Sequence, residues 1–452
     1  MIDSWLKAEI EAVPSYSAFA GVDEIVDAMR AIRAEYPDLA QLRRIGTSRL
    51  GEPIESLTIA GGGRHAVVFA FPHPNEPIGG LSALHLARRL CADAVLRASF
   101  DLTWHIVGCI DPDGTRLNEG WFAGPFTRTH YARHFYRPAG REQIEWTFPF
   151  QYKRAYFDDV LPETLGLMRL IDRTRPAFMC SLHNTELGGV YYYLSQPVTE
   201  LYPTLQAIPA HLGLPLHHGE PESPSMVSLA DGIFPEMRTD RMYDYRESIG
   251  EDPSGLRCGA TSSEYASQYG TLTLIGELPY WSDPTADDTT PTDTSYATAI
   301  RQQGEGLREF LALTTDVLEA VGPQLSTNSP FVRASRYFIP ALSRMPDSNS
   351  RRADEASAQR PATMAEVTSC ADVVHSFRLR YGGMLLRALD GELAVGNGTP
   401  TIRSERERLA DSYERWCALA EQATPAEPLP IRSLVATQYA AMLATARQAA
   451  GR

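Results

Sequence analysis

The segment His65–Cys91 reads HAVVFAFPHPNEPIGGLSALHLARRLC, and three different patterns follow one another along it. His65 to Phe71 form a short apolar run of the kind found in buried strands. A polar loop that contains His73 and Glu76 comes next. Apolar side chains then return at helical spacing, namely Ile78, Leu81, Leu84, Ala87 and Leu90. The segment therefore predicts a strand, a loop and a helix in succession.

The same alternation of strand and helix continues as far as residue 276. Four more apolar runs predict strands, at residues 102–110, 177–182, 190–194 and 270–276. Between the first two of these runs, residues 164–173 carry their apolar side chains on one helical face. Strands that alternate with helices are typical of parallel βαβ units, so the predicted fold class is α/β.

The last third of the chain has a different pattern. Helical periodicity dominates it, at residues 294–321, 362–393, 403–422 and 434–447. The polar residues 346–361 predict a loop. We therefore divide the chain into a catalytic α/β domain, residues 1–325, and a helical C-terminal region, residues 326–452. We expect any homo-oligomer to form through these C-terminal helices.

The composition argues against several classes of function. The 452 residues contain 42 Lys and Arg against 56 Asp and Glu, which gives a formal net charge of −14. Such an acidic chain has no general attraction to nucleic acid or anionic lipid, so we expect neither partner. No apolar run of about 18 residues is present, and the N-terminus lacks the basic start of a signal peptide. The six cysteines are scattered, without a C-x-x-C pair, so we expect a cytoplasmic protein.

Histidine and acidic side chains follow the predicted strands at the points where these strands end. His73 and Glu76 follow the first strand, His183 follows the third, and Glu277 follows the last. In open α/β sheets, ligands bind outside the carboxyl ends of the strands. Two histidines and two glutamates are what a catalytic zinc site needs. Three protein ligands leave one position for water, and a nearby carboxylate takes its proton.

The spacing His-x-x-Glu occurs three times, so the context has to decide among the copies. The three pairs are His73/Glu76, His183/Glu186 and His217/Glu220. Only the first pair lies between a predicted strand and a predicted helix, where Gly79 and Gly80 allow a close approach of the backbone. We expect His183 to act alone, and His217 lies in a Pro-rich stretch. The motif His-Glu-x-x-His is absent, which excludes the metalloproteases that use it.

In their order and spacing, these motifs resemble the zinc metallocarboxypeptidases, the carboxypeptidase A-like enzymes. The family's sequence of motifs corresponds here to His73/Glu76, Asp111–Gly114, His183 and Glu277. The resemblance covers roughly residues 45–290. It implies a mixed, mostly parallel, twisted central sheet with helices on both faces. It also implies that His73, Glu76 and His183 bind one zinc ion and that Glu277 is the general base.

The resemblance also implies an arginine that stabilises the oxyanion of the reaction. The metal usually shares this task with a cationic donor. Four arginines crowd the segment after Gly114: Arg128, Arg133, Arg137 and Arg141. We favour Arg137 for the oxyanion, with Arg128 as the second candidate, and we expect most of the four to be solvated surface residues.

The sequence departs from the family in the motif that grips the substrate's C-terminal carboxylate. The family has an Asn and an Arg there, and in the best alignment Glu145 and Trp146 replace them. A glutamate and a tryptophan favour a cationic group over a carboxylate, so we expect weaker recognition of a free carboxylate. Further substrate contacts are expected from Asn184, Glu264 and Tyr265, with Tyr269 as the alternative tyrosine.

Two motifs are also similar to the aspartoacylase and succinylglutamate desuccinylase branch. They are His73–Pro77 and Ser181–Thr185, and that branch cleaves an acyl group from a small amino acid at a similar zinc site. The turn Asp111–Gly114 favours the peptidase branch. We therefore interpret the chain as a zinc metallocarboxypeptidase that hydrolyses a peptide or a small amide-containing substrate. The alternative is an N-acyl amino acid deacylase.

Overall fold

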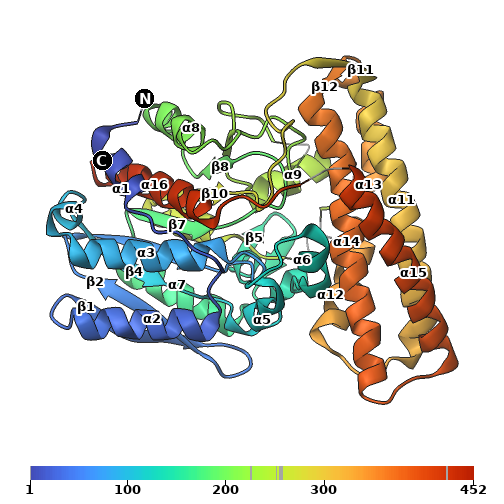
Figure 1. Cartoon of the computed structure of the whole chain (residues 1–452), viewed down its shortest axis with the longest axis horizontal. Coiled ribbons are helices and arrows are strands. Elements are labelled where there is room, and N and C mark those ends of the chain that lie inside the picture. The colour runs from blue at the N-terminus through green and yellow to red at the C-terminus, as the bar shows by residue number, and fades with distance from the viewer. Residues whose placement is uncertain (1, 224–225, 251, 254–257, 424–425, 452) are drawn as a thin grey trace.

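A mixed, eight-stranded sheet lies at the centre of the computed structural model, which describes residues 2–223, 226–250, 252–253, 258–423 and 426–451 (Figure 1). Along the sheet the strand order is β1-β2-β4-β3-β7-β10-β8-β9. Four neighbouring pairs are parallel: β3–β4, β3–β7, β7–β10 and β8–β9. The other three pairs are antiparallel. The predicted mixed, mostly parallel sheet is therefore confirmed.

The strands of this sheet lie where the apolar runs predicted them, with additional strands at both edges. Their bounds are β1 (Ala40–Thr47), β2 (Pro53–Ile59), β3 (Arg64–Ala70), β4 (Leu102–Val107), β7 (Phe178–Leu182), β8 (Tyr191–Leu194), β9 (Ile233–Pro235) and β10 (Leu272–Glu277). Two small two-stranded sheets pair β5 (Phe150–Tyr152) with β6 (Ala155–Phe157) and β11 (Pro291–Ser295) with β12 (Pro361–Thr363).

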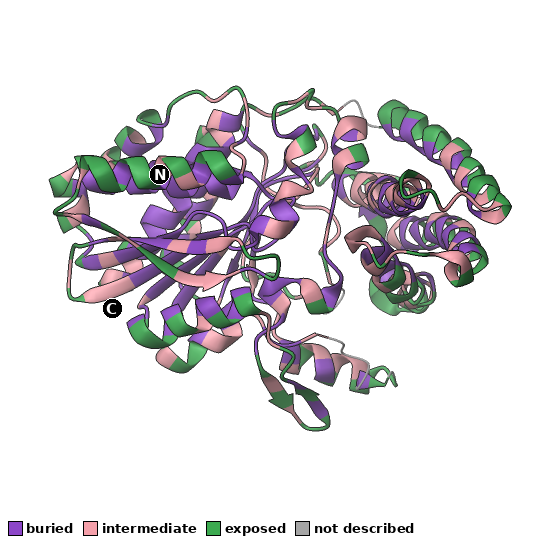
Figure 2. Ribbon diagram, turned by 90° about the horizontal axis from the view of Figure 1, so that it is seen from below, coloured by how far each residue is buried: buried purple, intermediate pink, exposed green. Residues whose placement is uncertain are grey.

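Helices cover both faces of the central sheet, as predicted. In β3, Ala66, Val68 and Ala70 join one apolar core, while Val67 and Phe69 join the other, because successive side chains of a strand point to opposite faces. The first core is shared with α1 (Ser4–Glu11), α2 (Val22–Glu35), α3 (Ile78–Ala92), α8 (Tyr202–His211) and α16 (Ile431–Ala450). The second is shared with α7 (Pro162–Thr174) and α10 (Ser262–Ala266). Figure 2 shows the buried strands between helices whose outer faces are exposed.

Short helices complete the α/β part of the chain. They are α4 (Ala94–Ala98), α5 (Pro112–Arg116), α6 (Arg128–His134) and α9 (Thr239–Ser248). In α5, the Asp111 side chain accepts a hydrogen bond from the backbone N–H of Gly114. The predicted turn at Asp111–Gly114 therefore begins a helix with an N-cap, which satisfies one of its free N–H groups.

The helical region lies beside the α/β part as a group of long helices (Figure 1). Its members are α11 (Tyr296–Val321), α12 (Pro330–Leu342), α13 (Met345–Asp354), α14 (Met364–Ala394) and α15 (Pro400–Ala423). The central helix α14 packs against α11, α12, α15 and, from the α/β part, α6. Helix α16 packs instead against α3 and β7. Packing thus groups α11 with the helical region and α16 with the sheet, and the division at residue 325 stays a prediction.

The predicted loop at residues 346–361 is wrong over its first half, which forms helix α13. Its sequence is polar, but Asn349 and Ala353 are buried. The amide of Asn349 donates to the side chain of Gln303 on α11 over 2.5 Å. Gly304 of α11 leaves room for this approach, because a Cβ there would lie 3.3 Å from the carbonyl of Pro346. Tertiary packing overrides the weak local propensity here.

None of the described helices is both long and apolar enough to cross a membrane. The cytoplasmic location and the homo-oligomer inferred from the sequence stay predictions.

Candidate functional site

His73, Glu76 and His183 meet at the carboxyl ends of two parallel strands. Since β3 and β7 are neighbours in register, with Ala70 opposite Leu182, the residues that follow them emerge side by side. Their candidate ligand atoms all lie within 4.8 Å of one another. Nδ1 of His73 is 3.1 Å from one oxygen of Glu76, and Nδ1 of His183 is 3.1 Å from the other. All three side chains are buried.

Local backbone structure aims the His73–Glu76 loop at the end of β7. Phe71 has a positive φ of 57°, which turns the chain out of β3. Glu76 then closes a turn by donating its N–H to the carbonyl of His73 over 3.1 Å. Gly79 lets α3 start close to β7, because a Cβ at this position would lie 2.7 Å from the Cβ of Leu182. The glycine pair singled out in the sequence therefore has a steric reason.

The three residues fit a metal ion. Burial is the main cause that lowers the pKa of His73, to about 3, so that its ring is neutral and can act as a ligand. Nδ1 of His183 is buried and has no hydrogen-bond partner in the described structure, although a carboxylate oxygen lies close by. A buried nitrogen without a hydrogen-bond partner, close to a carboxylate oxygen, can act as a metal ligand together with that oxygen. Two imidazoles and one carboxylate are a ligand set that zinc accepts.

Glu277 stands at the end of β10, next to this group. Its Oε1 lies 3.7 Å from Nδ1 of His183, and the side chain is buried. Burial raises the pKa of Glu277 well above its ordinary value, the carboxylates of Glu76 and Glu222 raise it further, and Arg137 opposes them. The carboxyl group that was predicted to handle a proton therefore lies at the site, in surroundings that favour its protonated form.

Of the two candidate arginines, only Arg137 reaches the metal-ligand group. Its Nη1 donates to Oε1 of Glu76 over 3.0 Å, and its guanidinium lies 5.6 Å from the centre of the Trp146 ring. Arg128 is instead paired with Asp372 of α14 over 2.7 Å, and it does not line the cavity described below. The structure therefore brings Arg137 to the site and leaves Arg128 behind the cavity wall.

The remaining residues predicted to contact substrate divide into two sets. Trp146 stacks edge-on against His73 with ring centres 5.6 Å apart, and Glu145 and Asn184 also line the cavity. Glu264 caps α10 and accepts hydrogen bonds from Thr239, and it lies outside the cavity lining. The same is true of Tyr265 and Tyr269, whose hydroxyl groups both donate to Asp172. The assignment of these residues to substrate stays a prediction.

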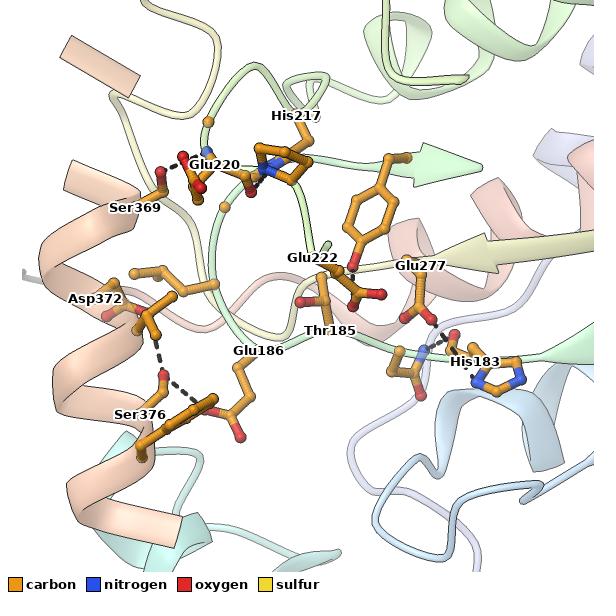
Figure 3. Close-up of a pocket in the computed structure, with 18 of the residues that line it drawn as sticks. His183, Thr185, Glu186, His217, Glu220, Glu222, Glu277, Ser369, Asp372 and Ser376 are labelled. Atoms are coloured by element: carbon orange, nitrogen blue, oxygen red, sulfur yellow. Dashed lines mark hydrogen bonds and ion pairs between the residues drawn. The ribbon is translucent and has the colours of Figure 1, made fainter. Parts of the chain in front are cut away.

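The metal-ligand group opens into a cavity of about 620 Å³. Strand ends and the loop at residues 217–222 form two of its walls, and α14 forms another. In Figure 3, Ser369, Asp372 and Ser376 on one helix face His183 and Glu277 across the cavity. This third wall could not be predicted, because the helical periodicity of residues 362–393 indicates a buried face but does not show what covers it.

Each of the arginines among the described cavity-lining residues already has a carboxylate partner. Arg137 pairs with Glu76 as above, Arg352 pairs with Glu220 over 2.5 Å, and Arg380 pairs with Glu186 over 3.1 Å. The second and third His-x-x-Glu copies thus use their glutamates for ion pairs with the helical region. By contrast, the partners of Glu222 among the described residues are two hydroxyl groups, those of Tyr191 and Tyr193, each over 2.7 Å. The cavity therefore keeps an acidic character.

This arrangement of strand-end ligands was compared with known proteins. Residues 25–218 match the zinc carboxypeptidase family. The match contains His73, Glu76 and His183, and it confirms the resemblance that the sequence motifs indicated. It supports a hydrolase of the zinc carboxypeptidase type for this chain. Glu277 and the helical region lie beyond the matched residues.

Among solved structures, the zinc carboxypeptidase match is accompanied by distant likenesses. Carboxypeptidase A from Helicoverpa armigera is 15% identical, over 62% of this chain and 70% of that chain, with a TM-score of 0.37. A metallo-carboxypeptidase from Burkholderia cenocepacia is 18% identical, over 57% and 60%, with a TM-score of 0.35. The murein-tripeptide amidase MpaA from Escherichia coli O157 is 16% identical, over 55% and 87%, with a TM-score of 0.29. These values do not bear on activity, and no curated protein matches the chain.

Proposed function

We propose that the protein is a zinc-dependent hydrolase that cleaves a C-terminal amide bond of a small peptide or conjugate. One zinc ion would be held by His73, Glu76 and His183. The observation that carries this proposal is the buried His-Glu-His group with the Glu277 carboxylate 3.7 Å from His183. Zinc, when bound, supplies an activated water and polarises the carbonyl group of the substrate.

The chain's own residues would handle the proton and the charge. Glu277 would accept a proton at its carboxylate as water attacks the amide carbon, and would return it to the leaving amine. Arg137 would donate hydrogen bonds to the carbonyl oxygen as negative charge develops there. Both side chains line the cavity, which supports their assignment. Trp146 and the α14 wall would keep water away from the reacting bond.

The charges of the cavity support a substrate without a strict need for a free carboxylate. A carboxylate would have to compete with Glu76, Glu220 or Glu186 for an arginine that is already paired. An ammonium or amide group beside Glu222 would meet a carboxylate whose partners, among the residues that the structure describes, are hydroxyl groups. The same argument disfavours the alternative, an N-acyl amino acid deacylase, because its substrates carry at least one carboxylate. The size of the cavity supports a compact substrate.

The test combines metal content with a substrate panel. Zinc content would be measured for the wild type, and hydrolysis would be followed on peptide pairs with free and amidated C-termini and on N-acyl amino acids. We expect about one zinc ion per chain and a kcat/KM for amidated substrates that is at least equal to that for free ones. A protein that binds no zinc would overturn the metal site. If the protein hydrolyses N-acyl amino acids and none of the peptides, its function is that of an N-acyl amino acid deacylase and the proposed peptide hydrolysis is wrong.

A further inference from the structure

A chain of hydrogen bonds runs from His183 into the protein interior, away from the metal-ligand group. Ser181 is in β7, and His183 follows the end of this strand two residues later. Oγ of Ser181 is 2.8 Å from Nε2 of His183. The same hydroxyl donates to Oε2 of Glu145 over 3.3 Å. Glu145 comes from a different segment, 36 residues earlier in the chain.

The count of donors and acceptors fixes the direction of this chain. Oε1 of Glu145 accepts two hydrogen bonds from Ser262, one from its N–H over 3.1 Å and one from its hydroxyl over 2.6 Å. Since a serine hydroxyl has one proton, and Ser181 gives it to Glu145, Oγ of Ser181 can only accept from His183. Nε2 of His183 therefore carries the ring proton. The lone pair of a neutral His183 is then left on Nδ1, the atom that faces Glu76.

Hydrogen bonds from Ser181 and Ser262 hold the carboxylate of Glu145 in the described structure. Its carboxylate is buried, and no lysine or arginine pairs with it in the described part of the chain. Burying a carboxylate without a cation costs several kcal/mol unless hydrogen bonds compensate. Burial raises the pKa of Glu145, whereas His183 and the two serines act in the opposite direction. The hydrogen bonds from Ser181 and Ser262 therefore compensate for the burial of this carboxylate, and Ser181 links it to Nε2 of His183.

We propose that Glu145 is a positioning residue for the metal site, acting on His183 through Ser181. The relay Glu145–Ser181–His183 holds the imidazole in one tautomer and one orientation, with Nδ1 directed at the metal position. Such partners of a metal-bound histidine raise its basicity and restrict its rotation. This inference rests on the proposed function only in assuming that His183 is a metal ligand. It gives Glu145, which also lines the cavity, a role in supporting a ligand beside the substrate contact predicted from the sequence.

The relay is tested by zinc affinity, measured by competition with a chromophoric chelator. Glu145→Gln removes the negative charge and places an amide N–H₂ group next to three hydrogen-bond donors, the hydroxyl of Ser181 and the N–H and hydroxyl of Ser262. Ser181→Ala removes the hydroxyl group that connects Glu145 to His183. We expect each to weaken zinc binding about 10- to 100-fold. The double variant should be no weaker than Ser181→Ala alone, because both remove the same interaction. Ser181→Thr, which keeps the hydroxyl, should restore most of the affinity.

Glu236→Gln is the matched control. Glu236 is also a buried carboxylate of the cavity wall and accepts a hydrogen bond from a serine, Ser263, but it does not contact His183. Its zinc affinity should stay within about two-fold of the wild type. If the wild type binds zinc and Glu145→Gln binds it equally well, the relay is wrong while the proposed function stands. Additive losses in the double variant would also overturn the relay. A wild type without zinc affinity would overturn the metal site itself.

Discussion

The guanidinium of Arg380 lies 3.1 Å from the carboxylate of Glu186, and this ion pair ties helix α14 to the loop that follows His183. Ser376, one turn earlier on the helix, donates to the same carboxylate over 3.1 Å. Both contacts join residues about 190 positions apart. The helical region therefore holds the rim of the metal-site cavity, and its removal would be expected to loosen the loop next to a metal ligand.

Arg380→Ala should destabilise the protein by about 3 kcal/mol, because it leaves the largely buried Glu186 carboxylate without its cation. We also expect a higher KM and a nearly unchanged zinc affinity, because the loop that contains Glu186 would move while the proposed zinc ligands keep their positions. Denaturant unfolding and steady-state kinetics measure the two effects. Arg406→Ala removes a partly exposed ion pair with Asp390 and should change stability by less than about 1 kcal/mol. Equal losses in both variants would contradict the proposed role of α14.

Glu277→Gln should lower kcat by about 10²- to 10⁴-fold and leave the zinc content unchanged. The amide keeps the shape of the side chain but cannot take a proton from water. Zinc analysis and single-turnover kinetics on the best substrate of the panel would check this. Activity that survives the substitution unchanged would remove Glu277 from the mechanism.

Glu222→Gln should separate cationic from neutral substrates. We expect kcat/KM to fall about 10-fold for substrates with an ammonium group near the scissile bond, because a carboxylate–ammonium contact in a partly desolvated cavity is worth roughly 1–2 kcal/mol. Neutral isosteric substrates serve as the control and should be affected less than two-fold. The same loss for both kinds of substrate would mean that Glu222 acts through Tyr191 and Tyr193 rather than on the substrate charge.

Asp111→Asn should change how stability depends on pH. Burial is the main cause that raises the pKa of Asp111 to about 7, so the folded protein keeps a proton that the unfolded chain loses near pH 4. Between these values the free energy of unfolding falls as pH rises, by at most about 1.4 kcal/mol per pH unit from this one group. Asn keeps the cap on Gly114 without the titrating proton. Relative to the wild type, the variant should therefore gain about 2 kcal/mol between pH 5 and pH 7 in urea unfolding. Parallel pH profiles would refute this.

Removal of zinc should lower the stability of the wild type. A ligand that binds only the folded state contributes about 2.7 kcal/mol when its free concentration is 100 times Kd. Thermal unfolding with and without a chelator, followed by re-addition of zinc, would measure the effect. His183→Ala, which removes a proposed ligand, should show little dependence on added zinc. If the melting temperature of the wild type changes neither with the chelator nor with added zinc, the proposed zinc site is wrong.

Local sequence patterns were enough to predict five of the eight strands of the sheet and the position of the metal-ligand group. Apolar runs marked the strands, and a parallel arrangement of β3, β7 and β10 brings their carboxyl ends to one edge. Side chains directly after those strands must then meet, whatever surrounds them. His73, Glu76, His183 and Glu277 could be named because their position depends on local pattern and on strand order.

The packing of distant segments determines what encloses this group and which of the charged side chains around it are paired. Periodicity showed that α14 has a buried face, but it could not show that this face covers the cavity. It also could not show that Arg128 turns towards Asp372, or that Glu145 is connected to His183 through Ser181. The polar α13 was missed for the same reason. Local patterns report how one element presents its side chains, whereas the pairing of a charge depends on which distant element packs against it.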